Sequence, residues 1–298
     1  MSSVRFSLVF LLALLAAVPL RADDICSAEE HSSANANLSR AREAESSGDL
    51  VTALKLVSNN DLAYCGDYKA ASAMLKRVTE QLGRKAEASG DLKAAFNYFT
   101  RGEWFDDAKR VGLKQLAAAP GDFGLASSLM SFMQQHDLRD GVEKVRENAR
   151  QQAQQLLAEE DRTFSVRMPH RDLLEKARDW LQLAGDPVVS VDERALQRGD
   201  SFLALDYVYA LQQALDYYEF VGRADQVAAV RAKARRLADQ LADGDNWAAA
   251  VELYQIAGDS ERAEQLAARR EANAAATEET RKEEFLKEQD DLEKELDL

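Results

Sequence analysis

ASGDLKAAFNYF, residues 88–99, has the pattern of one helix ending and another beginning at once. Gly90 suits the left-handed backbone conformation in which many helices end, because it has no side chain to clash. Asp91 suits the start of the next helix, where a carboxylate accepts unpaired backbone N–H groups. Ala95 and Phe99 follow at four-residue intervals and fall on one helix face. The stretch therefore predicts a tight turn between two closely packed helices.

The same pattern occurs six more times along the chain. Each copy has Gly-Asp, an alanine four residues after the aspartate and an apolar residue four further on. The copies are Gly48-Asp49, Ala53 and Val57; Gly66-Asp67, Ala71 and Leu75; Gly121-Asp122, Ala126 and Met130; Gly199-Asp200, Ala204 and Val208; Gly244-Asp245, Ala249 and Leu253; and Gly258-Asp259, Ala263 and Ala267. Only four prolines occur, and almost no run alternates apolar and polar residues as a strand does. We therefore expect an all-α chain of helix-turn-helix units.

A helix is also expected to open at Phe202 and Leu203. Its apolar residues form two stripes, which consist of Leu205, Val208, Leu211, Leu215 and Tyr218 and of Tyr207, Ala210, Ala214, Tyr217 and Val221. Two apolar faces are typical of a helix packed between neighbours in stacked layers.

The pattern Gly-Asp-x-x-x-Ala-x-x-x-aromatic resembles the turn and second helix of a tetratricopeptide repeat (TPR). The resemblance is strongest over residues 76–109, where the matching positions are Leu82-Gly83, Ala86, Gly90, Asp91, Ala95 and Phe99. The stretch AAAVELYQIAGDSERAEQLA, residues 248–267, instead resembles the looser helical repeats of trafficking-type solenoids. Intervals between the Gly-Asp pairs are 18, 24, 31, 78, 45 and 14 residues, whereas a regular array repeats at about 34. The resemblance implies a degenerate, right-handed helical-hairpin solenoid that binds a protein or peptide.

Composition divides the chain into five predicted segments. Breaks are indicated by Pro120-Gly121 and by the stretch from residue 185 to 200. The segments are a signal peptide (1–22), N-terminal TPR-like hairpins (23–120), middle helices (121–190), C-terminal hairpins (191–257) and a long charged helix (258–298). The last helix carries only a thin apolar stripe, which favours a solvated capping helix; a coiled-coil dimerisation arm is the alternative.

The N-terminal residues have the pattern of an export signal. Arg5 precedes an apolar run from Phe6 to Leu20 that is short for a membrane span, and the expected cut follows Ala22. An uncleaved anchor is the alternative. Cleavage would leave 276 of the 298 residues and change the net charge from −14 to −16. The export signal predicts a periplasmic or secreted protein. Because such an acidic chain repels phosphate backbones and anionic lipid surfaces, we expect no nucleic acid or membrane partner.

Two cysteines, Cys26 and Cys65, remain after that cut. In an oxidising compartment such a pair usually closes, which predicts a disulfide between the N-terminal segment and the first hairpin. The alternative is a reactive thiol at Cys65, because Gly66-Asp67 marks a helix start where the dipole lowers a thiol pKa.

Motifs for chemistry are sparse. His31, His136 and His170 lie in unrelated segments, and no zinc motif, nucleophile elbow or glycine-rich nucleotide loop occurs. We therefore predict no metal, no cofactor and no catalytic residue. Adjacent acids point about 100° apart on a helix, so we interpret them as solvated faces rather than acid-base pairs. They are Asp106-Asp107, Glu159-Glu160-Asp161 and Asp290-Asp291.

The basic cluster and the aromatic residues of the sequence also have structural interpretations. The densest basic cluster comprises Arg231, Lys233, Arg235 and Arg236, and its flanking acids predict a balanced surface helix. We expect the core to contain Trp104, Trp180 and Trp247 together with the aromatic cluster from Tyr207 to Phe220; a peptide-binding groove is the alternative. These observations favour a non-catalytic interaction scaffold of the cell envelope that binds an unidentified protein or peptide. A cell-wall enzyme with a superhelical part and a homo-oligomer joined through the C-terminal helix are the alternatives.

Overall fold

The computed structural model describes residues 26–59, 65–244 and 246–295. The predicted signal peptide lies outside these ranges. Within them the secondary structure is helical, and the one pairing of extended backbone is an isolated bridge between Ser165 and Met168. The all-α prediction is therefore confirmed for the described residues. None of the helices described has an apolar stretch long enough to cross a bilayer.

The chain forms two compact units, the first up to Val142 and the second from Glu143. The first contains α1 (Ala28–Ser46), α2 (Leu50–Val57), α4 (Tyr68–Ala88), α5 (Leu92–Arg101), α6 (Phe105–Ala118) and α7 (Phe123–Gln135). The boundary falls inside α8 (Arg139–Thr163). The second contains α9 (Arg171–Ala184), α10 (Val189–Leu203), α11 (Val208–Phe220), α12 (Ala224–Asp243), α13 (Trp247–Ala257) and α14 (Ser260–Glu295).

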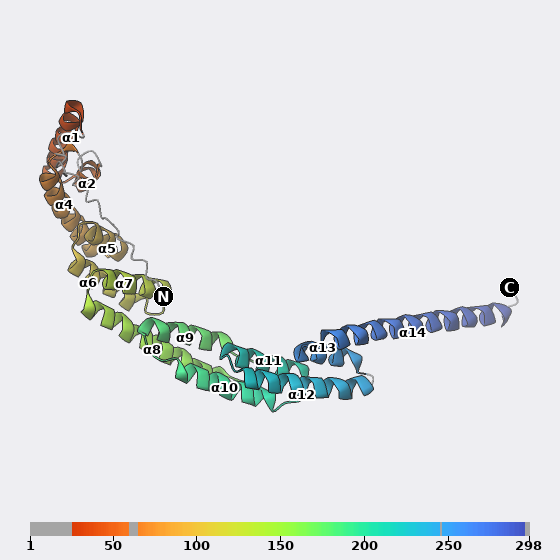
Figure 1. The fold of residues 1–298 in the computed structure, drawn as a ribbon. Coiled ribbons are helices and arrows are strands. Elements are labelled where there is room, and N and C mark those ends of the chain that lie inside the picture. Colours follow the sequence, from red (N-terminus) through yellow and green to blue (C-terminus); the bar gives the residue numbers. More distant parts are fainter. Residues whose placement is uncertain (1–25, 60–64, 245, 296–298) are drawn as a thin grey trace, which may run out of the picture. The chain divides into compact units, whose positions relative to one another are not determined.

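Within each unit, helices that follow one another in the chain lie side by side (Figure 1). In the second unit α11 also contacts α13, so helices two apart in the chain pack together. Buried alanines lie at many of these contacts; Ala53, Ala95, Ala210 and Ala250 are fully enclosed. Small residues let neighbouring helices approach closely, and the result is the solenoid-like arrangement that the sequence pattern predicts.

Seven helix ends in the described residues share one turn. In each, a left-handed residue donates its N–H to the carbonyl three residues earlier, and the next residue donates to the carbonyl five residues earlier. At Gly90, with φ of 81°, these bonds reach Glu87 and Ala86 at 3.0 and 2.9 Å. This double bond pattern is the Schellman motif, which pairs carbonyl groups that the helix end leaves free. The left-handed residues are Gly48, Gly90, Glu103, Asp137, Gly185, Gly222 and Gly258.

The predicted Gly-Asp turns have mixed outcomes. Those at Gly48, Gly90 and Gly258 are confirmed as Schellman turns, and the following aspartates accept backbone N–H groups of the next helix. Asp67 and Asp122 cap α4 and α7 through the N–H groups of Ala70 and Leu125, but without a left-handed glycine before them. Asp245 lies outside the described residues.

The prediction of a turn at Gly199-Asp200 is wrong. Both residues lie inside α10, and Gly199 is buried. A Cβ atom on Gly199 would lie 2.7 Å from Cε1 of Tyr218, so glycine is needed here for close packing of α10 on α11. Asp200 accepts a 2.6 Å hydrogen bond from the Tyr218 hydroxyl. The same two residues that elsewhere separate helices therefore join two neighbouring helices here.

The prediction that a helix opens at Phe202 is also wrong. Phe202 lies near the end of α10, and α11 begins only at Val208 after a short connection. From there the two-sided pattern is confirmed, because the α11 residues Ala210, Leu211, Ala214, Leu215, Tyr217 and Tyr218 are all buried. The predicted start of the helix was wrong because apolar residues continue across the connection between α10 and α11, so the sequence pattern does not mark the break.

Four of the seven Schellman turns do not match the Gly-Asp motif found in the sequence. Glu103 and Asp137 are left-handed without being glycine. Gly185-Asp186 lacks the alanine of the motif, and Gly222 is followed by Arg223 rather than by aspartate. Counted from Glu103 through Asp137, Gly185, Gly222 and Gly258, the intervals are 34, 48, 37 and 36 residues. The two earlier intervals, from Gly48 to Gly90 and from Gly90 to Glu103, are 42 and 13 residues, so the spacing is more even only from Glu103 onward.

The Gly90→Ala variant is expected to lower the free energy of unfolding by about 1 kcal/mol, because a side chain resists the left-handed conformation. Nothing lies within 4 Å of the added Cβ, so the effect isolates backbone strain. Gly124→Ala is the matched control, since Gly124 lies in α7 and its added Cβ would make only an ordinary 3.4 Å contact. Urea denaturation followed by circular dichroism checks both. A Gly90 variant as stable as the control would contradict the prediction.

The long C-terminal helix is confirmed over its described part. α14 has 36 residues and, at 1.5 Å per residue, a length of about 54 Å. Its beginning packs on α13, with Ala263 and Leu266 buried. From Glu271 to Leu292 every side chain is exposed. The chain thus provides no cover for this part of the helix within the described residues.

Candidate functional site

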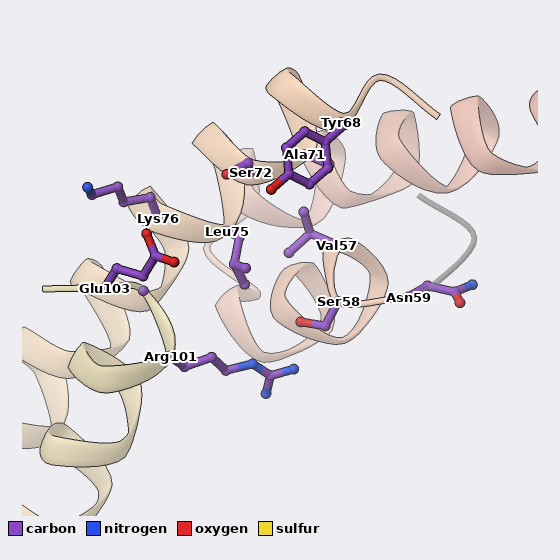
Figure 2. A pocket seen from close by; sticks show the side chains of 11 residues that line it. Val57, Ser58, Asn59, Tyr68, Ala71, Ser72, Leu75, Lys76, Arg101 and Glu103 are labelled. Carbon is purple, nitrogen blue, oxygen red and sulfur yellow. The ribbon is translucent and has the colours of Figure 1, made fainter. Parts of the chain in front are cut away.

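A pocket of about 300 Å³ lies in the first unit between α2, α4 and the turn after α5. Figure 2 shows Val57 and Leu75 at its centre, with the Tyr68 ring beside them and Arg101 extending from the end of α5 toward Ser58. The Tyr68 side chain is 63% exposed. The pocket therefore combines an apolar floor with a cationic side.

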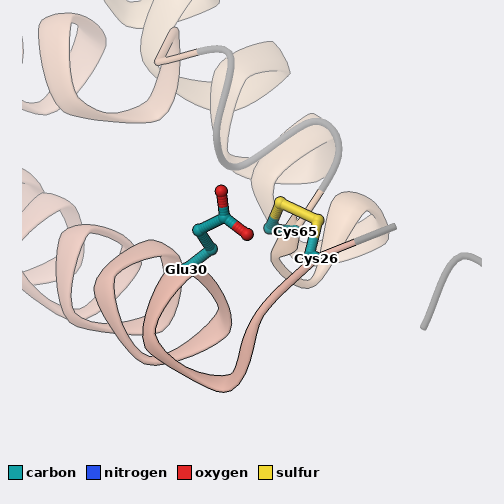
Figure 3. A group of neighbouring side chains, drawn as sticks. All are labelled: Cys26, Glu30 and Cys65. Atoms are coloured by element: carbon teal, nitrogen blue, oxygen red, sulfur yellow. A yellow bond between two sulfur atoms is a disulfide. The ribbon is translucent and has the colours of Figure 1, made fainter. Parts of the chain in front are cut away.

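Cys26 and Cys65 form a disulfide with a Cα–Cα distance of 5.6 Å, as predicted. Together with Glu30 they are the one group in the described part of the chain whose ligand atoms lie close enough to hold a metal ion (Figure 3). The disulfide removes the thiolates that a metal would need. Glu30 instead accepts the Ser27 backbone N–H at 2.6 Å in a capping box at the start of α1. The group is therefore structural.

The three histidines are separate in the fold, as expected. His31 Nδ1 lies 2.5 Å from the Cys65 carbonyl oxygen. The His136 ring stacks on Phe105 with 3.8 Å between centroids. His170 precedes α9 and makes no side-chain capping bond there. Within the described residues, the three histidines therefore do not share a metal-binding group.

A larger groove, of about 550 Å³, lies between α11 and α13 in the second unit. Val208, Tyr209, Gln212 and Leu215 line it from α11, and Glu252, Gln255 and Ile256 line it from α13. Side chains spaced three and four apart reach the groove because they share one helix face. Tyr209 remains 43% exposed, and the neighbouring Tyr207 remains 45% exposed. The groove thus offers a mostly apolar wall with amide and carboxylate groups at its edge.

A cluster of aromatic rings supports this groove from behind. The Phe202 ring contacts Tyr209 edge-on at 6.4 Å and stacks on Tyr217 at 5.9 Å. Phe164, from the connection after α8, meets Phe202 edge-on at 5.9 Å. Phe202 and Tyr217 are fully buried. Tyr209 therefore has one side against this buried cluster and another side exposed at the groove.

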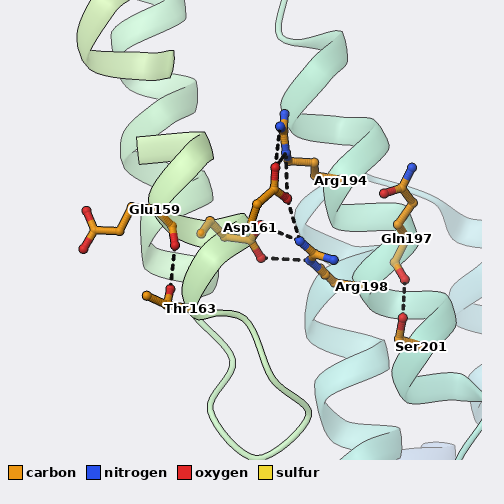
Figure 4. A network of polar contacts seen from close by, with 8 residues as sticks. Glu159, Asp161, Thr163, Arg194, Gln197, Arg198 and Ser201 are labelled. Atoms are coloured by element: carbon orange, nitrogen blue, oxygen red, sulfur yellow. Dashed lines mark hydrogen bonds and ion pairs between the residues drawn. The ribbon is translucent and has the colours of Figure 1, made fainter. Parts of the chain in front are cut away.

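A buried ion pair adjoins the aromatic cluster. Glu160 in α8 is completely buried, and Arg198 in α10 binds its two carboxylate oxygens at 2.9 and 3.0 Å. The Arg198 guanidinium also lies over the Phe164 ring, 4.1 Å from its centroid. Figure 4 shows Arg194 and Arg198 both reaching Asp161 from α10. Two arginines thus join the end of α8 to α10 beside the aromatic rings.

Ionisation of these groups follows from their partners. The hydrogen bond from Arg194 lowers the pKa of Asp161, and the charges of Arg194 and Arg198 lower it further. Burial raises the pKa of Tyr217, and the nearby Glu160 charge raises it further. The Tyr217 hydroxyl finds no hydrogen-bond partner in the described residues. Tyr217 is therefore a neutral member of the core, held there by packing.

In the described part of the chain, the acidic pairs singled out in the sequence line neither the first-unit pocket nor the α11–α13 groove. Asp106 pairs with Lys109, and Asp107 pairs with Arg110. Glu159 is exposed beside the buried Glu160. The burial of Glu160 was missed, because its partner Arg198 lies 38 residues away and no local pattern marks the pairing. For these acids the structure favours ion pairing and solvation over acid-base geometry.

The basic cluster is balanced by acids, as predicted. Arg231 pairs with Glu219 at 3.5 Å, and Arg235 pairs with Asp259 at 2.8 Å. Lys233 donates to the Leu203 carbonyl at 2.6 Å and thereby binds the end of α10. The tryptophans are core residues for the most part: Trp180 and Trp247 are buried, and Trp104 is half-buried. None of the three lines the α11–α13 groove, whose aromatic surface comes from Tyr209.

Comparison with protein-family models, with curated proteins and with solved structures finds no match for this chain. The relation to tetratricopeptide repeats stays a prediction from the turn motif. Among the sites described here, the α11–α13 groove is the candidate functional site, because it is the larger hollow and its wall contains the exposed Tyr209.

Proposed function

We propose that this chain is a non-catalytic scaffold of the cell envelope or periplasm that holds a segment of a partner protein in the α11–α13 groove. The observation that carries the proposal is a mostly apolar groove with an exposed tyrosine that packs edge-on against a buried aromatic ring. Aromatic side chains at the centre of a hollow are frequent energetic anchors of protein interfaces. A preorganised anchor also costs little entropy when a partner binds.

Charge defines the kind of segment that fits. Glu252 lies at the groove and forms no ion pair among the described residues. Residues 143–298 contain 34 acidic and 22 basic residues, a net charge of −12. Opposite charge steers partners and favours their association. The proposed ligand is therefore an extended or helical segment with an apolar side chain next to a lysine or arginine.

The TPR-like and exported character of the chain is part of the same proposal. Three of the intervals between Schellman turns are 34, 36 and 37 residues, close to the repeat of about 34 in tetratricopeptide arrays. The Cys26–Cys65 disulfide is of the kind that persists in oxidising compartments. Both observations support an exported helical-repeat scaffold.

The enzyme alternative receives less support. A glycan-cleaving site needs a carboxylic acid that donates its proton to substrate at an accessible position. Glu160 is the one fully buried acid among the described residues, and Arg198 binds both of its oxygens. It lines neither the α11–α13 groove nor the pocket of the first unit.

A photo-crosslinking experiment tests the proposal. A benzophenone amino acid replaces Tyr209 in the full chain, which is expressed in its native host and irradiated. We expect one dominant crosslinked protein, whose crosslinked peptide contains an apolar residue beside a lysine or arginine. The same reagent at Met168, an exposed residue of the α8–α9 connection, is the matched control and should not capture that protein. Capture should weaken in the Glu252→Lys variant, because like charges repel.

Two results would contradict the proposal. Equal capture from Tyr209 and Met168 would mean that the groove has no role in partner choice. Turnover of cell-wall glycan by the purified chain would favour the enzyme.

A further inference from the structure

We propose that the exposed part of α14 binds the first-unit pocket of a second copy of this chain, so that copies associate head to tail. The pocket contains Val57, Tyr68, Leu75 and Arg101. The segment of α14 that would enter it contains Phe285, Leu286 and Leu292. This contact does not use the α11–α13 groove, so its test is independent of the proposed scaffold function.

The first observation concerns the helix. Phe285, Leu286 and Leu292 are 63, 60 and 58% exposed, on a stretch of α14 that nothing in the described chain covers. Phe285 and Leu292 are seven residues apart and therefore lie on one face, two turns from each other. An amphipathic helix with such anchors is typical of segments that lie in an apolar groove of a partner.

The second observation is complementary charge. α14 contains twelve acidic and seven basic residues, a net charge of −5. Residues 50–101, which include the helices around the pocket, contain eight basic and five acidic residues, a net charge of +3. The attraction between these segments favours their pairing, whereas two copies of α14 would repel each other. The charges thus favour binding of α14 to the first unit over an α14 coiled coil.

The third observation is the lining of the pocket. Lys76 and Arg101 form no ion pair in the described residues, although the Lys76 ammonium lies over the Trp104 ring at 4.9 Å. Glu103 is the acidic member of the lining, which leaves a net charge of +1. The apolar floor between α2 and α4 has room for an aromatic side chain at about 300 Å³. Phe285 supplies the aromatic side chain, and the acids that follow it, Glu288, Asp290 and Asp291, supply the negative charge. Arg281 and Lys282 lie one turn before Phe285, so the charge match comes from the later part of the helix.

The geometry of such a contact predicts how the assembly behaves. Helix and pocket are different surfaces, so a bound pair leaves one helix and one pocket free, and the contact is heterologous. A contact through a few side chains buries little area and is therefore weak and reversible. We expect mass to grow with protein concentration and to fall when salt rises from about 50 to about 500 mM, because salt screens exposed charges.

Light scattering and sedimentation velocity on the full chain test the proposal. Arg101→Glu and Phe285→Glu should each be monomeric under conditions in which the wild type associates, with affinity lowered by about tenfold or more, equivalent to about 1.4 kcal/mol. An equimolar mixture of the two variants should form a 1:1 dimer, because one supplies an intact helix and the other an intact pocket. Glu103→Gln should associate more strongly than the wild type, which a merely destabilising change would not do.

The matched controls carry the same charge changes elsewhere. Arg40→Glu, on the exposed face of α1, and Ala274→Glu, on α14 before the apolar residues, should associate like the wild type. Three outcomes would overturn the proposal. They are a wild type that stays monomeric at every concentration and salt level, a mixture that fails to pair, and an Arg101→Glu variant that still dimerises while Phe285→Glu does not.

Discussion

Replacement of both Cys26 and Cys65 by serine is expected to lower the free energy of unfolding of the first unit by about 4 kcal/mol. The bridge closes a loop with a sequence separation of 39 residues and restricts the unfolded chain. In the folded chain Cys65 is buried, and both cysteines pack in the core cluster that α1, α2 and α4 share. Loss of the bridge therefore frees the start of α1 from the start of α4.

The fluorescence of Trp104, the tryptophan of the first unit, measures this effect during urea denaturation. Trp180 and Trp247 belong to the second unit and are replaced by phenylalanine in every sample of the series. Wild type reduced with dithiothreitol is the control, because it loses the bridge but keeps both sulfur atoms. Reduced wild type and the serine variant should unfold at similar urea concentrations. A first unit whose midpoint is unchanged by reduction would contradict the prediction.

A feature of this fold can be predicted from the sequence when the residues that determine it lie close together in the chain. The turn at Gly90 was predictable, because helix end, cap and packing residues lie within twelve positions. Gly199-Asp200 carries the same motif but lies inside α10, because Tyr218, 19 residues after Gly199, packs where a side chain at Gly199 would lie. Glu103 adopts the left-handed conformation without the glycine that would mark it. Local patterns therefore identify the type of element better than its limits.

The candidate site was predictable only in part. The two apolar faces of α11 indicated a helix between neighbours, and the aromatic cluster around Tyr207 to Phe220 suggested a groove as an alternative to core. The groove itself depends on α13, whose lining residue Glu252 lies 43 positions after Tyr209. No pattern within one helix indicates which other helix it will contact. The pairing of Glu160 with Arg198 is equally non-local and was missed for the same reason.

Replacement of Arg198 by methionine is expected to lower the free energy of unfolding of the second unit by about 3–5 kcal/mol. The variant leaves the fully buried Glu160 carboxylate without its partner. The double variant Glu160→Met/Arg198→Met should recover most of the loss, because two apolar side chains of similar size replace the pair. Arg194→Met is the matched control, since its partner Asp161 is 45% exposed and the loss should be at most about 1 kcal/mol.

The same variants connect the ion pair with the groove. Without Arg198 the Phe164 ring loses the guanidinium that covers it, and Phe164 contacts Phe202, which in turn contacts Tyr209. We expect photo-crosslinking from position 209 to weaken in Arg198→Met and to return in the double variant, in the same order as stability measured by the fluorescence of Trp180 and Trp247. If Arg198→Met costs no more than Arg194→Met, the buried pair does not fix α8 against α10. In that case the aromatic wall of the groove depends on ring packing alone.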